Sequence, residues 1–70
     1  MPLGDIVAIN LRSLRKARGL SQEELAHRVG INRNYVGMIE RRESSPTIDM
    51  LERLAVALGV DPVRMLTLDE

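Results

Sequence analysis

The stretch that decides the fold spans residues 20–41 and has the sequence LSQEELAHRVGINRNYVGMIER. Ser21 followed by Glu24 is a capping box, because the hydroxyl and the carboxylate each satisfy a free backbone N–H at the start of a helix. Gly30 ends that helix, since glycine accepts the left-handed conformation found just past a helix, and Asn32 caps the next helix. The sequence therefore predicts two short helices joined by a tight turn. Their inward-facing apolar residues are Leu25, Ala26, Val29, Val36 and Ile39.

Helical signals also flank this pair on both sides. Before it, an apolar stripe ends at Gly19; after it, Thr47 caps a helix that Gly59 closes. Asp61-Pro62 joins a capping residue to a proline suited to a first helical turn, so it opens a short last helix. No strand-like alternation occurs, and the sequence predicts an all-α, compact five-helix domain over residues 1–70. The apolar residues expected to face inward are Val7, Leu11 and Leu14 in the first helix, Ile48, Leu51, Leu54, Ala55 and Leu58 in the fourth, and Val63 and Leu66 in the fifth.

Composition excludes several classes of protein. The chain has 70 residues with no cysteine and one histidine, which excludes a disulfide framework, thiolate metal sites and multi-histidine zinc sites. No run of about 18 apolar residues and no signal-peptide pattern occurs, so we expect a cytoplasmic protein without a membrane span. We interpret His27 as a surface residue and Glu23-Glu24 as a capping feature, since adjacent helical residues do not face each other. Without a catalytic set or a phosphate-binding glycine loop, we expect neither an enzyme nor a cofactor, metal or small-molecule ligand.

Charge is unevenly placed along the chain. The 10 basic and 10 acidic residues give a net charge of 0, which by itself disfavours nucleic acid as a partner. Up to Ser45, however, eight basic residues stand against five acidic ones, and from Pro46 onward two stand against five. The two parts thus carry net charges of +3 and −3. This pattern is either ordinary solvated surface or a basic face with an acidic remainder, and the position of the basic residues on the fold decides between them.

Five segments of the sequence match a known family when taken together. They are residues 20–26 (LSQEELA), 30–36 (GINRNYV), 39–41 (IER), 46–47 (PT) and 57–60 (ALGV). With them the chain, from about Leu11 to Leu66, resembles the lambda-repressor-like, Cro/CI-type (XRE) helix-turn-helix family, whose motif is formed by the second and third helices. The resemblance implies a sequence-specific transcription regulator, such as a repressor. It also implies that a homodimer binds a two-fold symmetric operator in double-stranded DNA, with the third helix in the major groove.

The third helix, expected from about Arg33 to Arg41, supplies the candidate base contacts. Arg33 and Asn34 lie at the end that this family points into the groove; arginine can bind guanine O6 and N7, and asparagine adenine N6 and N7. Gly37 costs about 1 kcal/mol relative to alanine in a helix, which close approach to DNA would explain; a tolerated surface glycine is the alternative. Met38 is either a contact for a thymine methyl group or partly buried.

Residues beside this helix are expected to contact phosphates. The resemblance assigns Gln22 to a phosphate grip at the start of the second helix; the alternative is a helix-terminal residue without such a role. Tyr35 either donates its hydroxyl to a phosphate or covers the small core. Phosphate contacts set the register and give salt-dependent affinity without reading sequence. The expected set is Gln22, Asn32, Tyr35, Arg41, Arg42, Ser44 and Ser45.

The resemblance also gives two structural expectations. Arg15 and Glu40 match a partly buried ion pair that joins the first and third helices. Arg42 stands where the family commonly has glycine, so either Arg42 takes a left-handed conformation or the third helix ends differently. The path of the loop from Glu43 to Pro46 depends on which of the two occurs.

The dimer surface is expected near the fifth helix and the termini. Val63, Met65 and Leu68 are the candidate contacts, with Leu3 and Ile6 from an N-terminal arm, because grouped exposed apolar residues indicate a contact surface. We expect a weak dimer that tightens on DNA. The competing interpretation is a protein-interaction module, antitoxin-like or a scaffold, that uses the same fold without specific DNA binding. The sequence does not choose among phage repressors, restriction-modification controllers and antitoxins, or between repression and activation.

Overall fold

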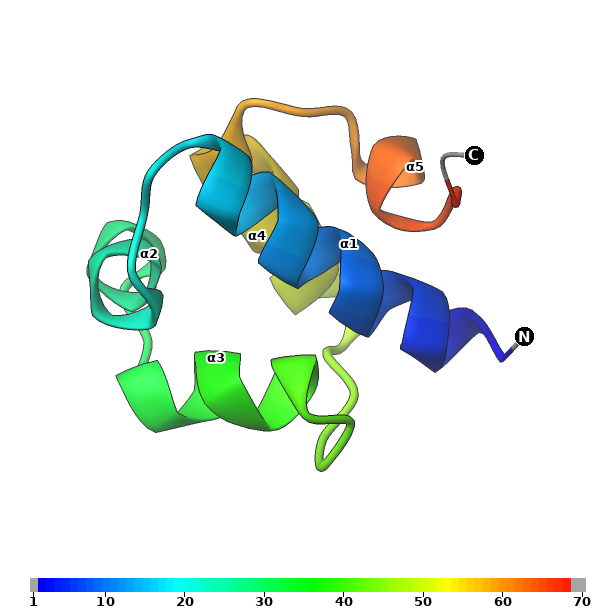
Figure 1. Cartoon of the computed structure of the whole chain (residues 1–70), viewed down its shortest axis with the longest axis horizontal. Coiled ribbons are helices and arrows are strands. Elements are labelled where there is room, and N and C mark those ends of the chain that lie inside the picture. The colour runs from blue at the N-terminus through cyan, green and yellow to red at the C-terminus, as the bar shows by residue number, and fades with distance from the viewer. Residues whose placement is uncertain (1, 69–70) are drawn as a thin grey trace.

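The computed structural model describes residues 2–68, which form five helices (Figure 1). This confirms the expected all-α architecture. α1 lies in front of α4, α2 and α3 form a corner to one side, and α5 covers the other end near the start of α1 (Figure 1). None of the helices in the described range has the length and apolar character needed to cross a membrane. The bounds are Leu3–Ala17 for α1, Gln22–Val29 for α2, Arg33–Glu40 for α3, Ile48–Leu58 for α4 and Pro62–Met65 for α5.

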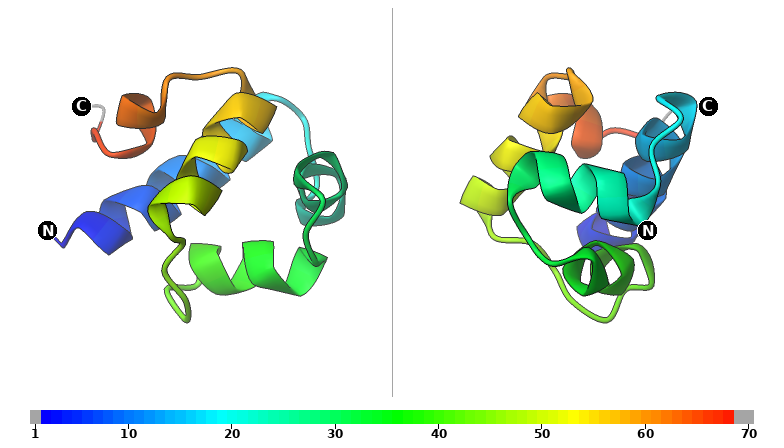
Figure 2. Two further views of the ribbon diagram at one scale, coloured as in Figure 1. Left: turned by 180° about the vertical axis from the view of Figure 1, so that it is seen from behind. Right: turned by 90° about the vertical axis from the view of Figure 1, so that its left-hand side faces the viewer.

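The corner formed by α2 and α3 is the predicted pair of short helices. Figure 1 shows α2 end-on and α3 from the side, and the right-hand view of Figure 2 reverses this, so the two helices cross steeply. Gly30 makes the turn with φ of 81°, a conformation that a residue with a Cβ rarely adopts. Ala26 is 2% exposed at the crossing, where a small side chain allows close approach. The outward face of α3 is thereby held across the end of α2.

Side-chain caps fix where the helices begin. The backbone N–H of Glu24 donates to Ser21 Oγ at 3.0 Å, and the backbone N–H of Ser21 donates to Glu24 Oε1 at 2.9 Å, which completes the predicted capping box. The hydrogen bond from the Ser21 backbone N–H lowers the pKa of the Glu24 carboxyl. Asn32, Thr47 and Asp61 accept backbone N–H groups at the starts of α3, α4 and α5 in the same way. The first helix begins earlier than its apolar stripe suggests, so Leu3 and Ile6 belong to α1 and not to a separate arm.

One apolar core joins the five helices, and most of the expected residues are in it. Two residues expected in the core are exposed instead: Ile48 is 86% exposed and Val63 is 64% exposed. Met65, expected on the surface, is fully buried. α5 is a single turn, too short for the spacing of two apolar residues to define its inward side. The buried apolar residues are Val7, Ala8, Leu11, Leu14, Leu20, Leu25, Ala26, Val29, Val36, Ile39, Leu51, Leu54, Ala55, Leu58 and Met65.

Asn10 of α1 fixes the orientation of α5 through hydrogen bonds to its backbone. Its buried amide Nδ2 donates to the carbonyl oxygens of Met65 and Thr67, each at 2.9 Å, and to that of Arg64 at 3.2 Å. These carbonyls lie at the end of α5, where helical backbone acceptors otherwise lack partners. Asn10 therefore holds the last turn against α1 with Met65 directed into the core.

Candidate nucleic-acid interface

The outward face of α3 and the start of α2 enclose a shallow hollow of about 500 Å³. Arg33 and Asn34 are exposed at the N-terminal end of α3, and Met38 is 36% exposed one turn later. Gln22 reaches the same hollow from α2. The structure thus brings candidate base contacts and a candidate phosphate contact together on one surface. The hollow is lined by Arg15, Ser21, Gln22, Glu23, Arg33, Asn34, Gly37 and Arg41.

A buried ion pair lies beneath this hollow and joins α1 to α3. Arg15 donates from Nε to Glu40 Oε2 at 2.7 Å and from Nη2 to Glu40 Oε1 at 3.0 Å, and the two side chains are 9% and 4% exposed. Nη1 donates to the Leu20 carbonyl at 2.8 Å. The hydrogen bond with Glu40 raises the pKa of Arg15, against an opposing effect of burial. Arg15 therefore has a structural role, because its guanidinium is held by protein acceptors and is not directed toward solvent.

The same carboxylate positions Gln22. Gln22 Nε2 donates to Glu40 Oε1 at 3.2 Å, so a half-buried amide is held at the first residue of α2. The N-terminus of a helix attracts anions through its unpaired backbone N–H groups and its dipole. A phosphate oxygen placed there would meet both the end of α2 and the fixed Gln22 side chain.

The two polar residues at the start of α3 differ in their contacts. Arg33 Nη1 donates to Glu23 Oε2 at 2.9 Å, and both side chains are about two-thirds exposed. Exposed ion pairs of this kind contribute roughly 0–1 kcal/mol, so Arg33 can exchange Glu23 for another acceptor at small cost. Asn34 donates its backbone N–H to Asn32 Oδ1 at 2.8 Å, and Asn34 itself is exposed. Glu23 was not among the sequence-based site residues, because it lies ten positions from Arg33 on a different helix.

Tyr35 and Gly37 are less open than expected. Tyr35 is half-buried and packs against the core, in agreement with the alternative in which it covers the core. Gly37 is buried although it belongs to the outward side of α3, because the side chains of Arg41 and Gln22 lie over it. A Cβ at this position would lie 2.7 Å from Arg41 Nη1 and 3.3 Å from Gln22 Oε1.

The loop after α3 is shaped by two further ion pairs. Arg41 donates from Nε and Nη2 to the Glu43 carboxylate at 2.8 and 3.2 Å, which raises the pKa of Arg41 and lowers that of Glu43. Arg42 has φ of 64°, so of the two alternatives it takes the left-handed conformation. Its guanidinium pairs with Asp5 at the start of α1. Ser45 is exposed and Ser44 half-buried on the remainder of this loop.

Comparison with known proteins identifies the motif. A helix-turn-helix family model, HTH_3, matches residues 11–64. The chain belongs to this helix-turn-helix family. It is 42% identical over 67 residues to the control protein C.SmaI of Serratia marcescens, a match that covers 96% of this chain and 80% of that protein. The resemblance to Cro/CI-type regulators is thereby confirmed, and the chain is a DNA-binding transcription regulator of a family that is not enzymatic.

Solved structures of the family share the complete fold. The hypothetical transcription factor NHTF from Neisseria superposes with a TM-score of 0.91 at 38% identity, over 94% of this chain and 76% of that chain. SinR, a master regulator for biofilm formation whose structure was solved in complex with DNA, superposes with a TM-score of 0.82 at 31% identity. That match covers 87% of this chain and 98% of the SinR chain. The lambda-repressor-like five-helix fold is confirmed by both.

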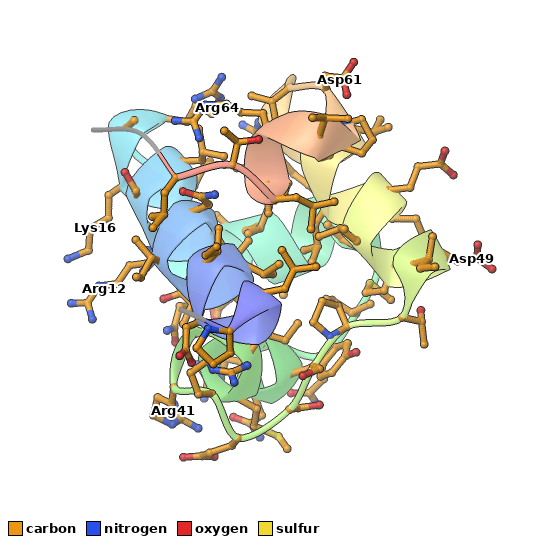
Figure 3. The ribbon with its side chains drawn as sticks, turned by 90° about the vertical axis from the view of Figure 1, so that its right-hand side faces the viewer. Arg12, Lys16, Arg41, Asp49, Asp61 and Arg64 are labelled. Atoms are coloured by element: carbon orange, nitrogen blue, oxygen red, sulfur yellow. The ribbon has the colours of Figure 1, made fainter. Side chains whose placement is uncertain are left out.

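Several exposed basic side chains lie beside the candidate interface, away from the acidic residues of α4 and of the start of α5 (Figure 3). Figure 3 shows Arg12 and Lys16 of α1 on the same side as Arg41, with Asp49 and Asp61 on the opposite side. The net charge of 0 therefore does not describe the surroundings of α3, where Arg12 and Lys16 lie near Arg41, and Arg33, Arg41 and Arg42 each have a carboxylate partner. The distribution of charge over the surface, and not the net charge, is the quantity that bears on DNA binding.

The candidate dimer surface needs one correction. Met65 is fully buried in the core and is not available to a partner, because Asn10 holds α5 with that side chain inward. Val63 and Leu68 are 64% and 39% exposed, Leu3 is 56% exposed, and Ile6 is half-buried. Sequence reasoning missed Ile48, whose spacing from Leu51 suggested the core. An apolar hollow of about 340 Å³ lies between the start of α1, the start of α4 and the end of α5. It is lined chiefly by Leu3, Val7, Pro46, Ile48, Leu51 and Leu66.

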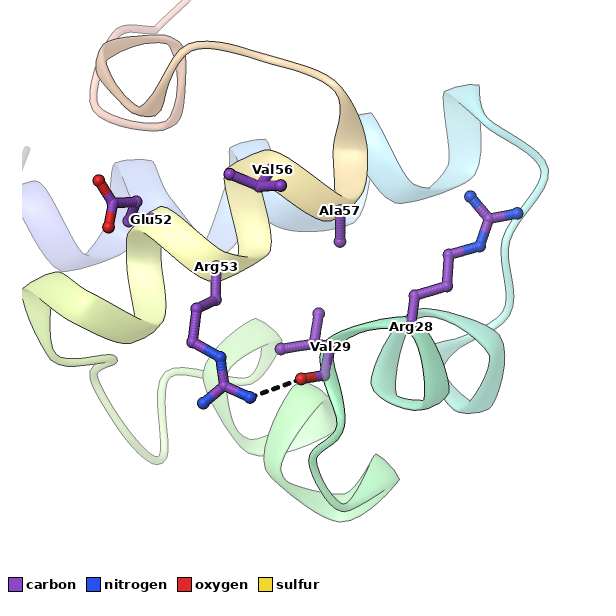
Figure 4. Close-up of a pocket in the computed structure, with 6 residues that line it drawn as sticks. All are labelled: Arg28, Val29, Glu52, Arg53, Val56 and Ala57. Carbon is purple, nitrogen blue, oxygen red and sulfur yellow. Dashed lines mark hydrogen bonds between the residues drawn. The ribbon is translucent and has the colours of Figure 1, made fainter.

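A third hollow, of about 300 Å³, lies between α2 and α4 (Figure 4). Arg53 of α4 crosses it, and its Nη2 donates to the Val29 carbonyl at 2.6 Å. That carbonyl lies in the last turn of α2, where a cation is favourable. Arg53 therefore acts in the fold by attaching α4 to the end of α2. Among residues 2–68, no group of three His, Cys, Asp or Glu side chains is placed to hold a metal ion.

Proposed function

We propose that this regulator binds a two-fold symmetric operator as a homodimer, with α3 in the major groove. The observation that carries the proposal is the shared hollow, in which Arg33 and Asn34 at the start of α3 adjoin Gln22 at the start of α2. An α-helix with its side chains is about 10–12 Å across and the major groove is about 12 Å wide, so the groove admits α3. Base edges would be contacted by Arg33, Asn34 and Met38, while the expected contact of Gly37 is blocked by the side chains that cover it. Phosphates would be contacted by Gln22, Asn32, Tyr35, Arg41, Arg42, Ser44 and Ser45.

The dimer would form at the end of the molecule opposite α2. Figure 1 places the start of α1 and α5 together at that end, well away from α2. One recognition helix contacts few base pairs, so two copies at half-sites about 34 Å apart give the specificity. The exposed apolar residues there are few, so we expect a weak dimer that tightens on DNA. Its proposed members are Leu3, Ile48, Val63, Leu66 and Leu68.

Selection from a pool of random duplexes at two salt concentrations tests the function. Enrichment of a site with two-fold symmetry supports the operator-binding dimer. Weak binding without enrichment, lost steeply as salt rises, would favour the protein-interaction module, because phosphate contacts alone are independent of sequence.

Arg33→Ala tests the proposed placement of α3. We expect roughly 10- to 100-fold weaker binding to the selected operator and a relaxed preference at one base pair of each half-site, since a bidentate arginine–guanine contact contributes about 1–3 kcal/mol. Affinity is measured on operators with single base-pair changes. Arg28→Ala, at the other end of α2, is the control and should change neither quantity. Full retention of the preference by Arg33→Ala would contradict the placement.

Val63→Arg tests the dimer surface. A charge at this exposed residue would be introduced by both copies into one small apolar interface, which disfavours association. Operator affinity should fall at least about tenfold while thermal unfolding is unchanged. Ile9→Arg is the matched control, because Ile9 is 46% exposed on the side of α1 opposite Val7, which lines the hollow. Equal operator affinities for the two variants would show that the dimer uses another surface.

A further inference from the structure

Gly37 lies on the outward side of α3 but is covered by the side chain of another residue. It lies at the middle of the helix, between exposed Asn34 and exposed Met38, yet it is buried. The atom nearest to a hypothetical Cβ is Arg41 Nη1, at 2.7 Å. Arg41 follows the last residue of α3, so its side chain runs back along the helix by one turn, the direction that helical side chains take. The Arg41 guanidinium therefore lies over the middle of α3, in the space that the missing Gly37 side chain leaves.

The Arg41 guanidinium has two edges that can each donate a pair of hydrogen bonds, and Glu43 binds one of them. Arg41 Nε and Nη2 donate to the two oxygens of Glu43 at 2.8 and 3.2 Å. Within residues 2–68, no protein acceptor receives a hydrogen bond from Nη1. The edge formed by Nη1 and the outer hydrogen of Nη2 thus keeps its donors, and that planar pair of donors matches the O6 and N7 acceptors of guanine.

We propose that Arg41 contacts a guanine from the middle of α3, with Gly37 and Glu43 as its positioning residues. The inference rests on the proposed placement of α3 in the major groove. It replaces the expected phosphate contact of Arg41 with a base contact, because the guanidinium lies over the centre of the recognition helix and not beyond its end. Arg41 also lines the same hollow as Arg33 and Asn34. The α3 face would then present two arginines to the bases, one from its first turn and one folded over Gly37.

Arg41→Lys distinguishes a base contact from a phosphate contact. Lysine keeps the positive charge that a phosphate needs but lacks the planar fork that binds guanine. We select duplexes from a random pool with the wild-type protein and then measure affinity for the selected duplex and for its single base-pair variants. The proposal requires that Arg41→Lys lose roughly 10- to 100-fold of discrimination at one G·C pair, with other positions unaffected. Arg28→Lys, on the far end of α2, serves as the matched control and keeps all preferences.

Gly37→Ala tests the positioning by a change that favours folding. Alanine is the better helix former, so thermal unfolding should occur at the same or a higher temperature. The added Cβ displaces the flexible end of Arg41, so the same G·C preference should weaken. Glu43→Gln, which removes the charge that holds the guanidinium, should weaken it as well.

The outcomes separate this inference from the proposed function. Loss of preference at one shared base pair in Arg41→Lys and Gly37→Ala supports both. A wild-type protein with clear preferences that Arg41→Lys retains, or loses uniformly across all duplexes, overturns the base contact and leaves the operator-binding function intact. A wild-type protein that enriches no sequence overturns both.

Discussion

Glu40→Ala should lower the free energy of unfolding by about 3–5 kcal/mol, because it leaves the Arg15 charge buried with only the Leu20 carbonyl as a partner. A domain of this length has a stability on the order of 5 kcal/mol, so between a few per cent and about half of the protein would be unfolded at room temperature. Thermal unfolding followed by circular dichroism measures the effect. At roughly 4–8 °C per kcal/mol, the transition should shift down by roughly 12–40 °C.

Two controls separate burial from simple loss of an ion pair. Glu43→Ala removes a carboxylate that is 52% exposed and also paired with an arginine, and it should leave the melting temperature nearly unchanged. The double variant Arg15→Met with Glu40→Leu replaces the buried pair with apolar side chains and should recover most of the loss. An unchanged melting temperature for Glu40→Ala would refute the interpretation of this pair as a buried element of the fold.

The ends of the helices could be predicted because their causes are local. Ser21, Asn32, Thr47 and Asp61 each accept a backbone N–H two or three residues ahead, so a short window of sequence contains both partners. The turn at Gly30 is local in the same sense. The inward faces of α2 and α3 could be predicted too, because each of these helices completes two turns and its apolar spacing is unambiguous.

Features that depend on distant partners could not be predicted from spacing. Arg42 meets Asp5 across 37 positions, and Asn10 reaches Met65 across 55. The apolar stripe of α4 included Ile48, yet no other element covers that residue and it is 86% exposed. The Arg15–Glu40 pair, 25 positions apart, was expected only through family resemblance. Which α3 side chains contact bases remains a prediction, since the DNA is the distant partner in that case.

Met65→Arg is the second change expected to have a large effect. Met65 is fully buried among residues of α1, α4 and α5, and a buried charge without a partner is strongly unfavourable. The loss should be at least about 4 kcal/mol, close to the whole stability of a domain this size. Chemical denaturation followed by circular dichroism measures it, with Met65→Leu as the conservative variant that should retain a well-folded protein.

Comparison of Met65→Arg with Val63→Arg tests the rotation of α5 directly. Both changes introduce the same side chain into one turn of helix, two residues apart, but Val63 is 64% exposed and Met65 is not exposed at all. If α5 is oriented as Asn10 holds it, only Met65→Arg destabilises the monomer, and only Val63→Arg lowers operator affinity in a folded protein. The opposite assignment, with Val63→Arg unfolding the chain, would mean that α5 is rotated as its apolar spacing alone suggests. In the first case the buried Asn10 amide, and not the pattern of α5, determines which side chains the proposed dimer can use.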